Sequence, residues 1–310
     1  QWLSPTPITD HSGEKITVDY RRFVVGLNGD FGNWYWDLAY QNSYSSGDYK
    51  SKLIYDDAIT PYNFSSGSCA GEVTPVRGVP CIDVPWLDPQ FLAGNISPEV
   101  RAFLFGEQTG NTVYKQQSVE GFISGDLMEL PAGQLGSAFG FQYQKDSIND
   151  VPGPETLRGN AWGQTSAGIT TGEHNSRAVF AELQVPLVKS LPLMESLDLT
   201  LSGRWTDVSS YGSDSTYKAG LNWNIANGFR MRASRGTSFR SPALFELYLN
   251  NQTSFVAQRS IDPCINWGDG LAAGTTREIV ANNCAADGIP ADFAGGAITA
   301  TVTTGGGAGQ

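Results

Sequence analysis

The sequence has few charged residues and two histidines, and both scarcities exclude classes of function. With 20 Lys and Arg against 31 Asp and Glu, the net charge is −11, so there is no broad basic surface to neutralise a nucleic acid. The two histidines, His11 and His174, lie far apart in the chain. This spacing favours neither a metal site nor a Cys/His nucleophile pair, and we expect no metal and no cofactor.

Signals for catalysis and for membrane helices are also missing. The sequence contains no discernible Ser/His/Asp set, no G-x-S-x-G element and no G-x-G-x-x-G element, so we predict that the chain is not an enzyme. Its apolar runs are much shorter than the roughly 20 residues that a spanning helix needs. The chain begins at Gln1 without a signal-peptide pattern and ends in TVTTGGGAGQ, and we interpret it as part of a longer protein.

The four cysteines form two local pairs, Cys69 with Cys81 and Cys264 with Cys284. Each pair lies in a polar stretch rich in Gly and Pro, and the spacing fits no zinc pattern. We therefore predict two short loops closed by disulfides in an oxidising compartment. Four unpaired buried thiols are the alternative.

Glycine and aromatic residues are abundant, and the hydrophobic period is two. There are 36 Gly, and aromatic residues make up 11% of the chain, whereas the helix formers Lys and Glu are scarce. In SLDLTLSGRWTDVS, for example, Leu197, Leu199 and Leu201 alternate with polar residues such as Thr200. This alternation predicts strands with one apolar and one polar face.

The predicted strands are long and come in pairs. The members of each pair are joined by a short connection, the longest being VKSLPLME: 16–30 with 33–50, 112–130 with 133–146, 175–188 with 196–210, and 215–226 with 229–240. Long polar stretches follow at about 51–111, 147–174 and 241–310. Short turns on one side and long loops on the other are typical of an outer-membrane barrel. We predict an all-β, antiparallel transmembrane β-barrel, present in part, with about eight or more strands of a larger barrel and long extracellular loops.

Local patterns refine this prediction. The apolar face of the first strand shifts from Ile16, Val18 and Tyr20 to Phe23, Val25 and Leu27, which predicts a β-bulge near Arg21–Arg22. Aromatic residues gather near strand ends, as in the girdles of membrane barrels: Trp34, Trp36, Tyr40, Tyr44, Trp223 and Phe229.

The basic stretch FRMRASRGTSFR is predicted to be one more strand. Met231 and Ala233 would face lipid, and Arg230 and Arg232 would face the wet interior, where arginine costs little. Ser241 and Pro242 then resemble the N-cap and first residue of a short helix.

The segment RGTSFRSPALFELY resembles the barrel signature of TonB-dependent outer-membrane receptors, in which a strand ending in Arg-x-Pro leads into a Glu-Leu-Tyr-type segment. The upstream strands over about 175–240 are similar to those of that family, and residues 1–170 agree in layout. IDPC…NNCAADGIP looks like a disulfide-bearing surface loop of some members. The matching positions are Phe239, Arg240, Pro242, Leu244, Glu246, Leu247 and Tyr248.

The resemblance implies that residues 1–310 are part of one barrel domain in a Gram-negative outer membrane, without the plug domain and TonB box in this chain. It implies active uptake of a scarce ligand, such as a ferric siderophore, cobalamin, haem or an oligosaccharide. The TonB–ExbB–ExbD complex would supply energy through the plug, and outer-membrane lipid would surround the barrel.

Loop aromatics and acids are the candidate ligand-binding residues, because aromatic rings stack on sugars or chelators. They are Trp86, Asp88 and Phe91 in the first long loop and Trp267 and Asp269 in the last. Packing of the loops against one another is the alternative role. For the whole chain, the alternatives are a passive porin-like channel, a secreted β-sandwich that binds carbohydrate, and an outer-membrane hydrolase with a carboxylate pair.

Overall fold

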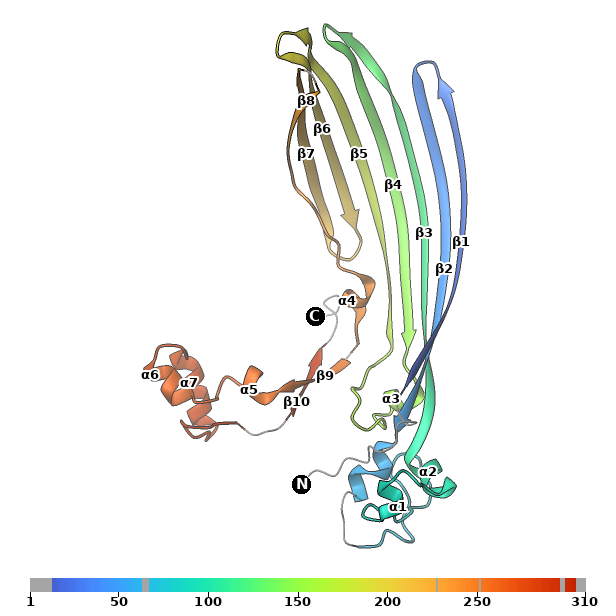
Figure 1. The fold of residues 1–310 in the computed structure, drawn as a ribbon, viewed down its shortest axis with the longest axis vertical. Coiled ribbons are helices and arrows are strands. Elements are labelled where there is room, and N and C mark those ends of the chain that lie inside the picture. Colours follow the sequence, from blue (N-terminus) through green and yellow to red (C-terminus); the bar gives the residue numbers. More distant parts are fainter. Residues whose placement is uncertain (1–12, 63–66, 227, 251, 296–298, 305–310) are drawn as a thin grey trace.

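The computed structural model describes residues 13–62, 67–226, 228–250, 252–295 and 299–304. Its main feature is one antiparallel sheet in which eight strands pair in sequence order (Figure 1). Within the described residues β1 and β8 are the two edges, so the sheet is not closed, as expected for part of a barrel. The strands are β1 (Glu14–Phe31), β2 (Trp34–Ile54), β3 (Phe105–Leu130), β4 (Gly133–Val151), β5 (Thr170–Leu191), β6 (Met194–Val208), β7 (Gly212–Ala226) and β8 (Phe229–Gly236).

The predicted fold class is confirmed, and the β-sandwich alternative is wrong. A sandwich requires a second sheet stacked about 10 Å from the first, whereas the other described sheet is a two-stranded ribbon of β9 (Gln252–Ala257) and β10 (Thr299–Thr304). Strands β2, β3, β4 and β5 exceed their predicted lengths at the loop end, whereas β6 and β8 end earlier than predicted, at Val208 instead of residue 210 and at Gly236 instead of residue 240. The connections between β2 and β3 and between β4 and β5 therefore span 55–104 and 152–169, less than the predicted 51–111 and 147–174.

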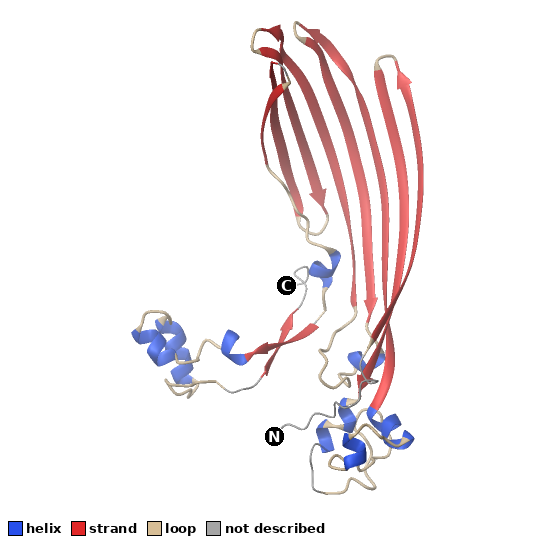
Figure 2. Ribbon diagram, viewed as in Figure 1, coloured by secondary structure: helices blue, strands red, loops and turns tan. Residues whose placement is uncertain are grey.

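Helices occur in the connections and in the chain after β8 (Figure 2). All of them are short, so none contributes a second layer to the sheet. They are η2 (Asp56–Ala58), η3 (Thr60–Tyr62), α1 (Pro89–Leu92), α2 (Pro98–Leu104), α3 (Pro154–Leu157), α4 (Leu244–Tyr248), α5 (Gln258–Ile261), α6 (Trp267–Ala272) and α7 (Glu278–Ala286).

The connection between β5 and β6 is tighter than the sequence predicts. The strands continue to Leu191 and Met194, which leaves a two-residue turn instead of the eight residues of VKSLPLME. Leu193 reaches the left-handed conformation that the tight turn requires, with a φ of 58°. A register shift between Pro186 and Val188 absorbs the proline, because proline has no N–H to donate to the ladder.

The β-bulge predicted near Arg21–Arg22 is wrong. The pairing of β1 with β2 is continuous from Glu14 opposite Ser51 to Phe31 opposite Trp34. Side chains alternate along a regular strand, so Val18 and Val25 lie on opposite faces of the sheet. The apolar residues of β1 therefore change face partway along the strand.

The main buried core lies at the loop end of the sheet and is formed by Ile54 at the end of β2 and by the connection between β2 and β3. Its fully buried members are Ile54, Ala58, Ile59, Phe91, Val100, Phe103 and Leu104. Both predicted disulfides are present: Cys69–Cys81 closes a loop beside this core, and Cys264–Cys284 links the chain before α6 to α7. The alternative of unpaired thiols is thus contradicted.

Candidate functional site

Strand register divides the sheet into two faces, because residues directly opposite one another on paired strands share a face. We call one of them the inner face; it carries Arg22, Asn222 and Arg232. The chain that follows β8 folds back onto it, since Tyr248 lies against Gly172. The other is the outer face, which carries Phe23.

The outer face carries an apolar band without a charged side chain. Large side chains of the band are exposed, including Leu27 at 64% and Met231 at 53%. Such a continuous exposed apolar surface is suited to lipid and not to water. Its members are Phe23, Val25, Leu27, Gly29, Phe31, Trp34, Trp36, Leu38, Tyr40, Val119, Gly121, Ile123, Gly125, Ser137, Phe139, Phe141, Tyr143, Val179, Ala181, Leu183, Val185, Leu197, Leu199, Leu201, Gly203, Trp205, Tyr217, Ala219, Leu221, Trp223, Met231 and Ala233.

The edge of the apolar band on the loop side crosses the strands obliquely. The first polar outer residue beyond it is Arg21 on β1 and Arg235 on β8, and strand register aligns Arg235 with Phe31 of β1. The edge thus moves ten residues, about 33 Å, while crossing seven strand spacings, about 34 Å. A membrane plane along this edge implies strands tilted by about 45°, as in outer-membrane barrels.

Aromatic residues follow this edge. Tyr40, Tyr143, Trp205 and Tyr217 are the last members of the apolar band before the polar region on β2, β4, β6 and β7. Their rings combine an apolar body with a polar group, which favours the lipid–water boundary. Of the six residues predicted from the sequence for the girdles, Tyr40 lies on this edge and Tyr44 lies beyond it, whereas Trp34, Trp36, Trp223 and Phe229 lie near the turn end of the sheet.

The same edge explains why β1 changes its apolar face. Beyond the band the outer face of β1 is polar, with Lys15, Asp19 and Arg21, and the apolar residues Ile16 and Val18 lie on the inner face. A strand that projects past a bilayer has water on its outer side. The change of apolar face along β1 therefore reflects the change from lipid to water outside the sheet, and the backbone pairing stays regular.

A polar network crosses the inner face. Arg22 Nη2 donates to Gln41 Oε1, Gln41 Nε2 donates to Gln116 Oε1 at 2.9 Å, and Gln116 Nε2 donates to Asp146 Oδ1 at 3.0 Å. His174 Nε2 lies 3.6 Å from Asp146 Oδ2. The network joins β1 to β5, so this face is wet where the opposite face is apolar. Tyr114 and Gln144 also donate to Asp146.

A cavity of about 1,200 Å³ lies on the inner face near the loop end. Its wall is formed by β1 to β4, by residues 152–167 and by Phe245 of α4. Tyr49 lies flat on the backbone at Gly110, where any Cβ would overlap its ring. Asp150 Oδ1 accepts hydrogen bonds from the Tyr49 hydroxyl at 3.1 Å and from Thr112 Oγ1 at 2.6 Å.

This arrangement can bind a ligand by stacking and by hydrogen bonding. The Tyr49 ring is held in a fixed orientation, and Tyr114 and Trp162 add aromatic surface to the cavity. Within the described residues Asp150 Oδ2 has no hydrogen-bond partner, so it can accept from a ligand. A mostly apolar hollow with a few fixed polar groups is the usual form of a small-molecule site.

The receptor-like signature forms a compact structure at the edge of this cavity. Arg240 Nη2 donates to both carboxylate oxygens of Glu246, at 2.7 and 2.9 Å, and Glu246 Oε2 accepts from the Ala243 N–H at 2.8 Å. The hydrogen bond from Arg240 lowers the pKa of the Glu246 carboxyl. Leu244 and Leu247 are buried.

The same segment is attached to the sheet at its other end. The Tyr248 hydroxyl donates to the Glu173 carbonyl at 2.7 Å, and the Tyr248 ring covers Gly172 of β5.

The predicted cap at Ser241–Pro242 is wrong: the helix begins at Leu244 and Ala243 is its N-cap. The Glu246 carboxylate binds the N–H of Ala243, which sets the start of the helix there. The Phe239 ring lies 6.1 Å from that of Tyr211.

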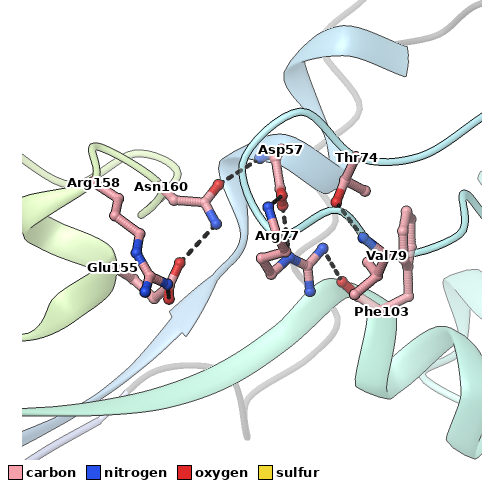
Figure 3. A network of polar contacts seen from close by, with 8 residues as sticks. All are labelled: Asp57, Thr74, Arg77, Val79, Phe103, Glu155, Arg158 and Asn160. Atoms are coloured by element: carbon pink, nitrogen blue, oxygen red, sulfur yellow. Dashed lines mark hydrogen bonds and ion pairs between the residues drawn. The ribbon is translucent and has the colours of Figure 1, made fainter.

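Two connections are joined by a buried polar network (Figure 3). Arg77 Nε donates to Asp57 Oδ1 at 2.8 Å, and its Nη2 donates to the Phe103 carbonyl at 2.9 Å. Asn160 Oδ1 accepts from the Asp57 N–H at 2.9 Å, and Asn160 Nδ2 donates to Glu155 Oε2 at 2.7 Å. The connections 55–104 and 152–169 are therefore joined, and residues of the second line the cavity.

The ligand-binding residues predicted from the sequence occupy two separate places. Asp88 caps α1 by accepting hydrogen bonds from the N–H groups of Gln90 and Phe91. Phe91 is buried in the loop core, and its ring centre lies 5.6 Å from that of Trp86 in an edge-to-face arrangement. In the segment after β8, Trp267 Nε1 donates to the Ile289 carbonyl, and Asp269 lies in the first turn of α6. None of these five residues lines the cavity.

Sequence reasoning missed the cavity residues. Tyr49, Tyr114 and Asp150 lie at strand ends beyond the apolar band, where the alternation is polar on both faces. The signal that was present is the pairing of inner-face tyrosines with glycines on the neighbouring strand, such as Tyr49 beside Gly110. This pairing can be recognised only when the register of the strands is known.

Among the residues that the structure describes, no group of three or more His, Cys, Asp or Glu side chains is arranged to hold a metal ion.

In the described part of the chain, no helix combines the length and the apolar character needed to cross a membrane.

Comparison with known proteins gives one match. Searches of curated proteins and of solved structures returned nothing similar. A family model described as "TonB dependent receptor-like, beta-barrel" matches residues 2–283. The match covers the whole eight-stranded sheet, the signature segment and both disulfides except for Cys284. Together with the apolar band, the strand tilt and the wet inner face, this match shows that the chain belongs to the TonB-dependent receptor-like β-barrel family, which is a family of outer-membrane transporters and receptors and not of enzymes.

Proposed function

We propose that this chain is the barrel wall of an outer-membrane receptor for the TonB-energised uptake of a scarce ligand. The observation that carries the proposal is the family match over residues 2–283. The charge-free apolar band opposite a hydrogen-bonded inner face supports it, since a transport barrel needs lipid on one side and water on the other. The loop end faces outward in this proposal.

Energy would come from the TonB–ExbB–ExbD complex, acting on a plug and TonB box elsewhere in the protein. The inner face offers such a plug a polar wall, with Gln116, Asp146 and His174 arranged across three strands. A passive porin would need no such partner. This difference separates the two functions experimentally.

The cavity around Tyr49 and Asp150 is the proposed ligand site. A ferric siderophore, cobalamin, haem and an oligosaccharide all remain candidates. The cavity lies near the loop end and is lined in part by the connection 152–169, which is joined to the connection 55–104. Contact of Trp86, Asp88, Phe91, Trp267 and Asp269 with the ligand stays a prediction.

Growth experiments test the function. A strain lacking the complete gene is supplied with limiting iron as different chelates, with haem, with cobalamin or with oligosaccharides, each with TonB present or deleted. We expect one ligand to be taken up only when both the gene and TonB are present. Uptake that continues without TonB would instead assign a passive channel.

The ligand site is tested with Tyr49→Ala in the complete protein. Removing the ring from Gly110 also removes the donor to Asp150, so we expect binding of the transported ligand to weaken at least tenfold. Tyr35→Ala is the matched control, because Tyr35 lies on the same face at the turn end, opposite Asp30. Equal losses in the two variants would argue against this cavity.

A further inference from the structure

The cavity near the loop end carries negative charge without a matching cation. Asp150 and Glu14 line it from the inner face, where Glu14 lies opposite Ser51. Among the lining residues that the structure describes, Lys52 is the one cation, and register places it on the outer face, opposite Glu107. The charges that face into the cavity are therefore both negative.

The protein does not neutralise either of these carboxylates. Over the described ranges of the chain, no ion pair includes Asp150 or Glu14. Asp150 Oδ1 accepts hydrogen bonds from two neutral hydroxyl groups, those of Tyr49 and Thr112, and in the described structure Oδ2 accepts none. Both negative charges are therefore available to a cation from outside the protein.

The connection 55–104, which is joined to the cavity wall through residues 152–169, is acidic as well. It contains six acids and two arginines, Arg77 and Arg101. Charges of one sign around a hollow raise the local concentration of ligands of the opposite sign. We therefore expect the loop end to attract cations and to repel anions. The six acids are Asp56, Asp57, Glu72, Asp83, Asp88 and Glu99.

The Tyr49 ring adds a flat surface beside the free carboxylate oxygen. One face of the ring lies on Gly110 of β3, and the hydroxyl donates to Asp150 Oδ1 at 3.1 Å. A flat group stacked on the other face of the ring comes within reach of Asp150 Oδ2. Trp162 and Phe245 supply further rings to the same cavity.

A flat cation with N–H groups satisfies both features of the cavity. A guanidinium group is planar, stays charged at physiological pH and stacks on aromatic faces, and an amidinium group has the same planar, charged form. The N–H groups of such a cation donate charge-assisted hydrogen bonds to a carboxylate. A ligand that presents a phosphate or a carboxylate would instead meet two negative charges.

We propose that the ligand of this receptor presents a guanidinium or amidinium group to the cavity, where this group stacks on Tyr49 and donates to Asp150 Oδ2. The proposal rests on the proposed function, in which this cavity is the ligand site. It assigns a charge to the ligand, which the candidate classes of ligand leave open.

The test uses three small probes of nearly the same flat shape and different charge. Benzamidine is a cation, benzamide is neutral and benzoate is an anion. Their affinities for the complete receptor in detergent are measured by ligand-observed NMR titration, for the unaltered protein and for Asp150→Asn. Asp30→Asn is the matched control, because Asp30 lies on the same face at the turn end, opposite Tyr35.

Selectivity for charge is the expected result. The unaltered protein should bind benzamidine at least tenfold more tightly than benzamide, and benzoate most weakly. Asp150→Asn should lose at least tenfold in affinity for benzamidine and less than twofold for benzamide, because asparagine keeps an oxygen that accepts from the Tyr49 hydroxyl and holds the ring in place. Asp30→Asn should stay within twofold of the unaltered protein for both probes.

Several outcomes would overturn the proposal. They are binding of benzamide or benzoate as tightly as benzamidine, equal benzamidine affinities of Asp150→Asn and the unaltered protein, equal losses in the two variants, and the absence of saturable benzamidine binding. If Asp150→Asn does not fold, as judged by heat-dependent migration in electrophoresis, the comparison of the three probes on the unaltered protein decides.

Uptake assays keep this proposal separate from the proposed function. TonB-dependent uptake of a ligand that has no cationic nitrogen group would overturn the inference and leave the function standing. Charge-selective binding of benzamidine that depends on Asp150, in a protein without TonB-dependent uptake of any ligand, would support the cation site and refute only the function.

Discussion

Arg77 links the two ends of the connection between β2 and β3, because its side chain contacts both Asp57 and the carbonyl of Phe103. Its side chain is 12% exposed, the Asp57 side chain is fully buried, and the guanidinium lies 3.7 Å from the centre of the Tyr55 ring. Removing one partner of a buried pair leaves an uncompensated charge. The residue therefore combines a charge role with a packing role.

We expect Arg77→Met to destabilise this connection by about 3 kcal/mol or more, because the Asp57 carboxylate would stay buried without its partner. Arg158→Met is the matched control: Arg158 is 56% exposed, and such pairs contribute about 0–1 kcal/mol. Hydrogen exchange over residues 67–104 in the complete protein measures the difference. Similar protection in both variants would contradict the assigned role of Arg77.

The Glu246 carboxyl gives the signature segment a dependence on pH. Arg240 lowers its pKa below the ordinary 4.5. A carboxyl with a lowered pKa contributes stability above its ordinary pKa, and this contribution is lost as pH falls through the lowered value. We expect proteolysis after β8 by an acid-stable protease to accelerate as the pH falls below the ordinary carboxyl pKa of 4.5. Glu246→Gln should be cleaved at a similar rate across this range, and a variant that keeps the pH dependence would assign it to another group.

Within single strands, the alternation of side chains is the part of the fold that the sequence predicts well. The inward direction of Arg230 and Arg232 and the outward direction of Leu199 follow from period two alone, and the register confirms them. Features that depend on the surroundings were missed. The apolar run of Ile16 and Val18 changes face because water replaces lipid beyond the band, and this cannot be read from one strand.

The connections were predicted less well for a related reason. Phe91 and Asp88 are residue types that are common in binding loops. In the structure, however, Phe91 is buried in the core and Asp88 is the N-cap of α1. Tyr49 and Asp150 become a pair only when β2, β3 and β4 are aligned, since 101 residues separate them in sequence. Contacts between distant segments carry no local signal.

The facing of β6 gives a direct test at the level of the strand. Leu199 lies between Val185 and Leu221 on the outer face, whereas Thr200 lies between Gln184 and Gly220 on the inner face. An arginine facing lipid costs about 2–4 kcal/mol at the bilayer midplane, and one facing the lumen costs little. We expect Leu199→Arg to reduce the amount of assembled, heat-modifiable receptor severalfold and Thr200→Arg to leave it nearly unchanged. Equal amounts would contradict the assignment of the faces.

The whole sheet has two properties that a complete barrel must reconcile. The edge of the apolar band rises by ten residues over eight strands, which fixes the tilt, and the described residues leave β1 and β8 with one unpaired side each. Unpaired backbone groups at membrane depth cost several kcal/mol each, because lipid offers them no hydrogen bonds. A sheet of this kind is stable in a bilayer only when further strands pair with both edges.

Closure of the eight strands on themselves is opposed by their dimensions. β1 has 18 residues and β8 has eight, so pairing the two edges would leave more than half of β1 without partners. We expect residues 13–304, expressed alone and refolded into liposomes, to give no heat-modifiable band and to bind thioflavin T through their free edges. The complete receptor, refolded in parallel, should migrate as a folded barrel and bind little dye. A heat-modifiable product from residues 13–304 would mean that the sheet can close with eight strands, and the tilt and band derived from its register would then describe a small barrel without room for a plug.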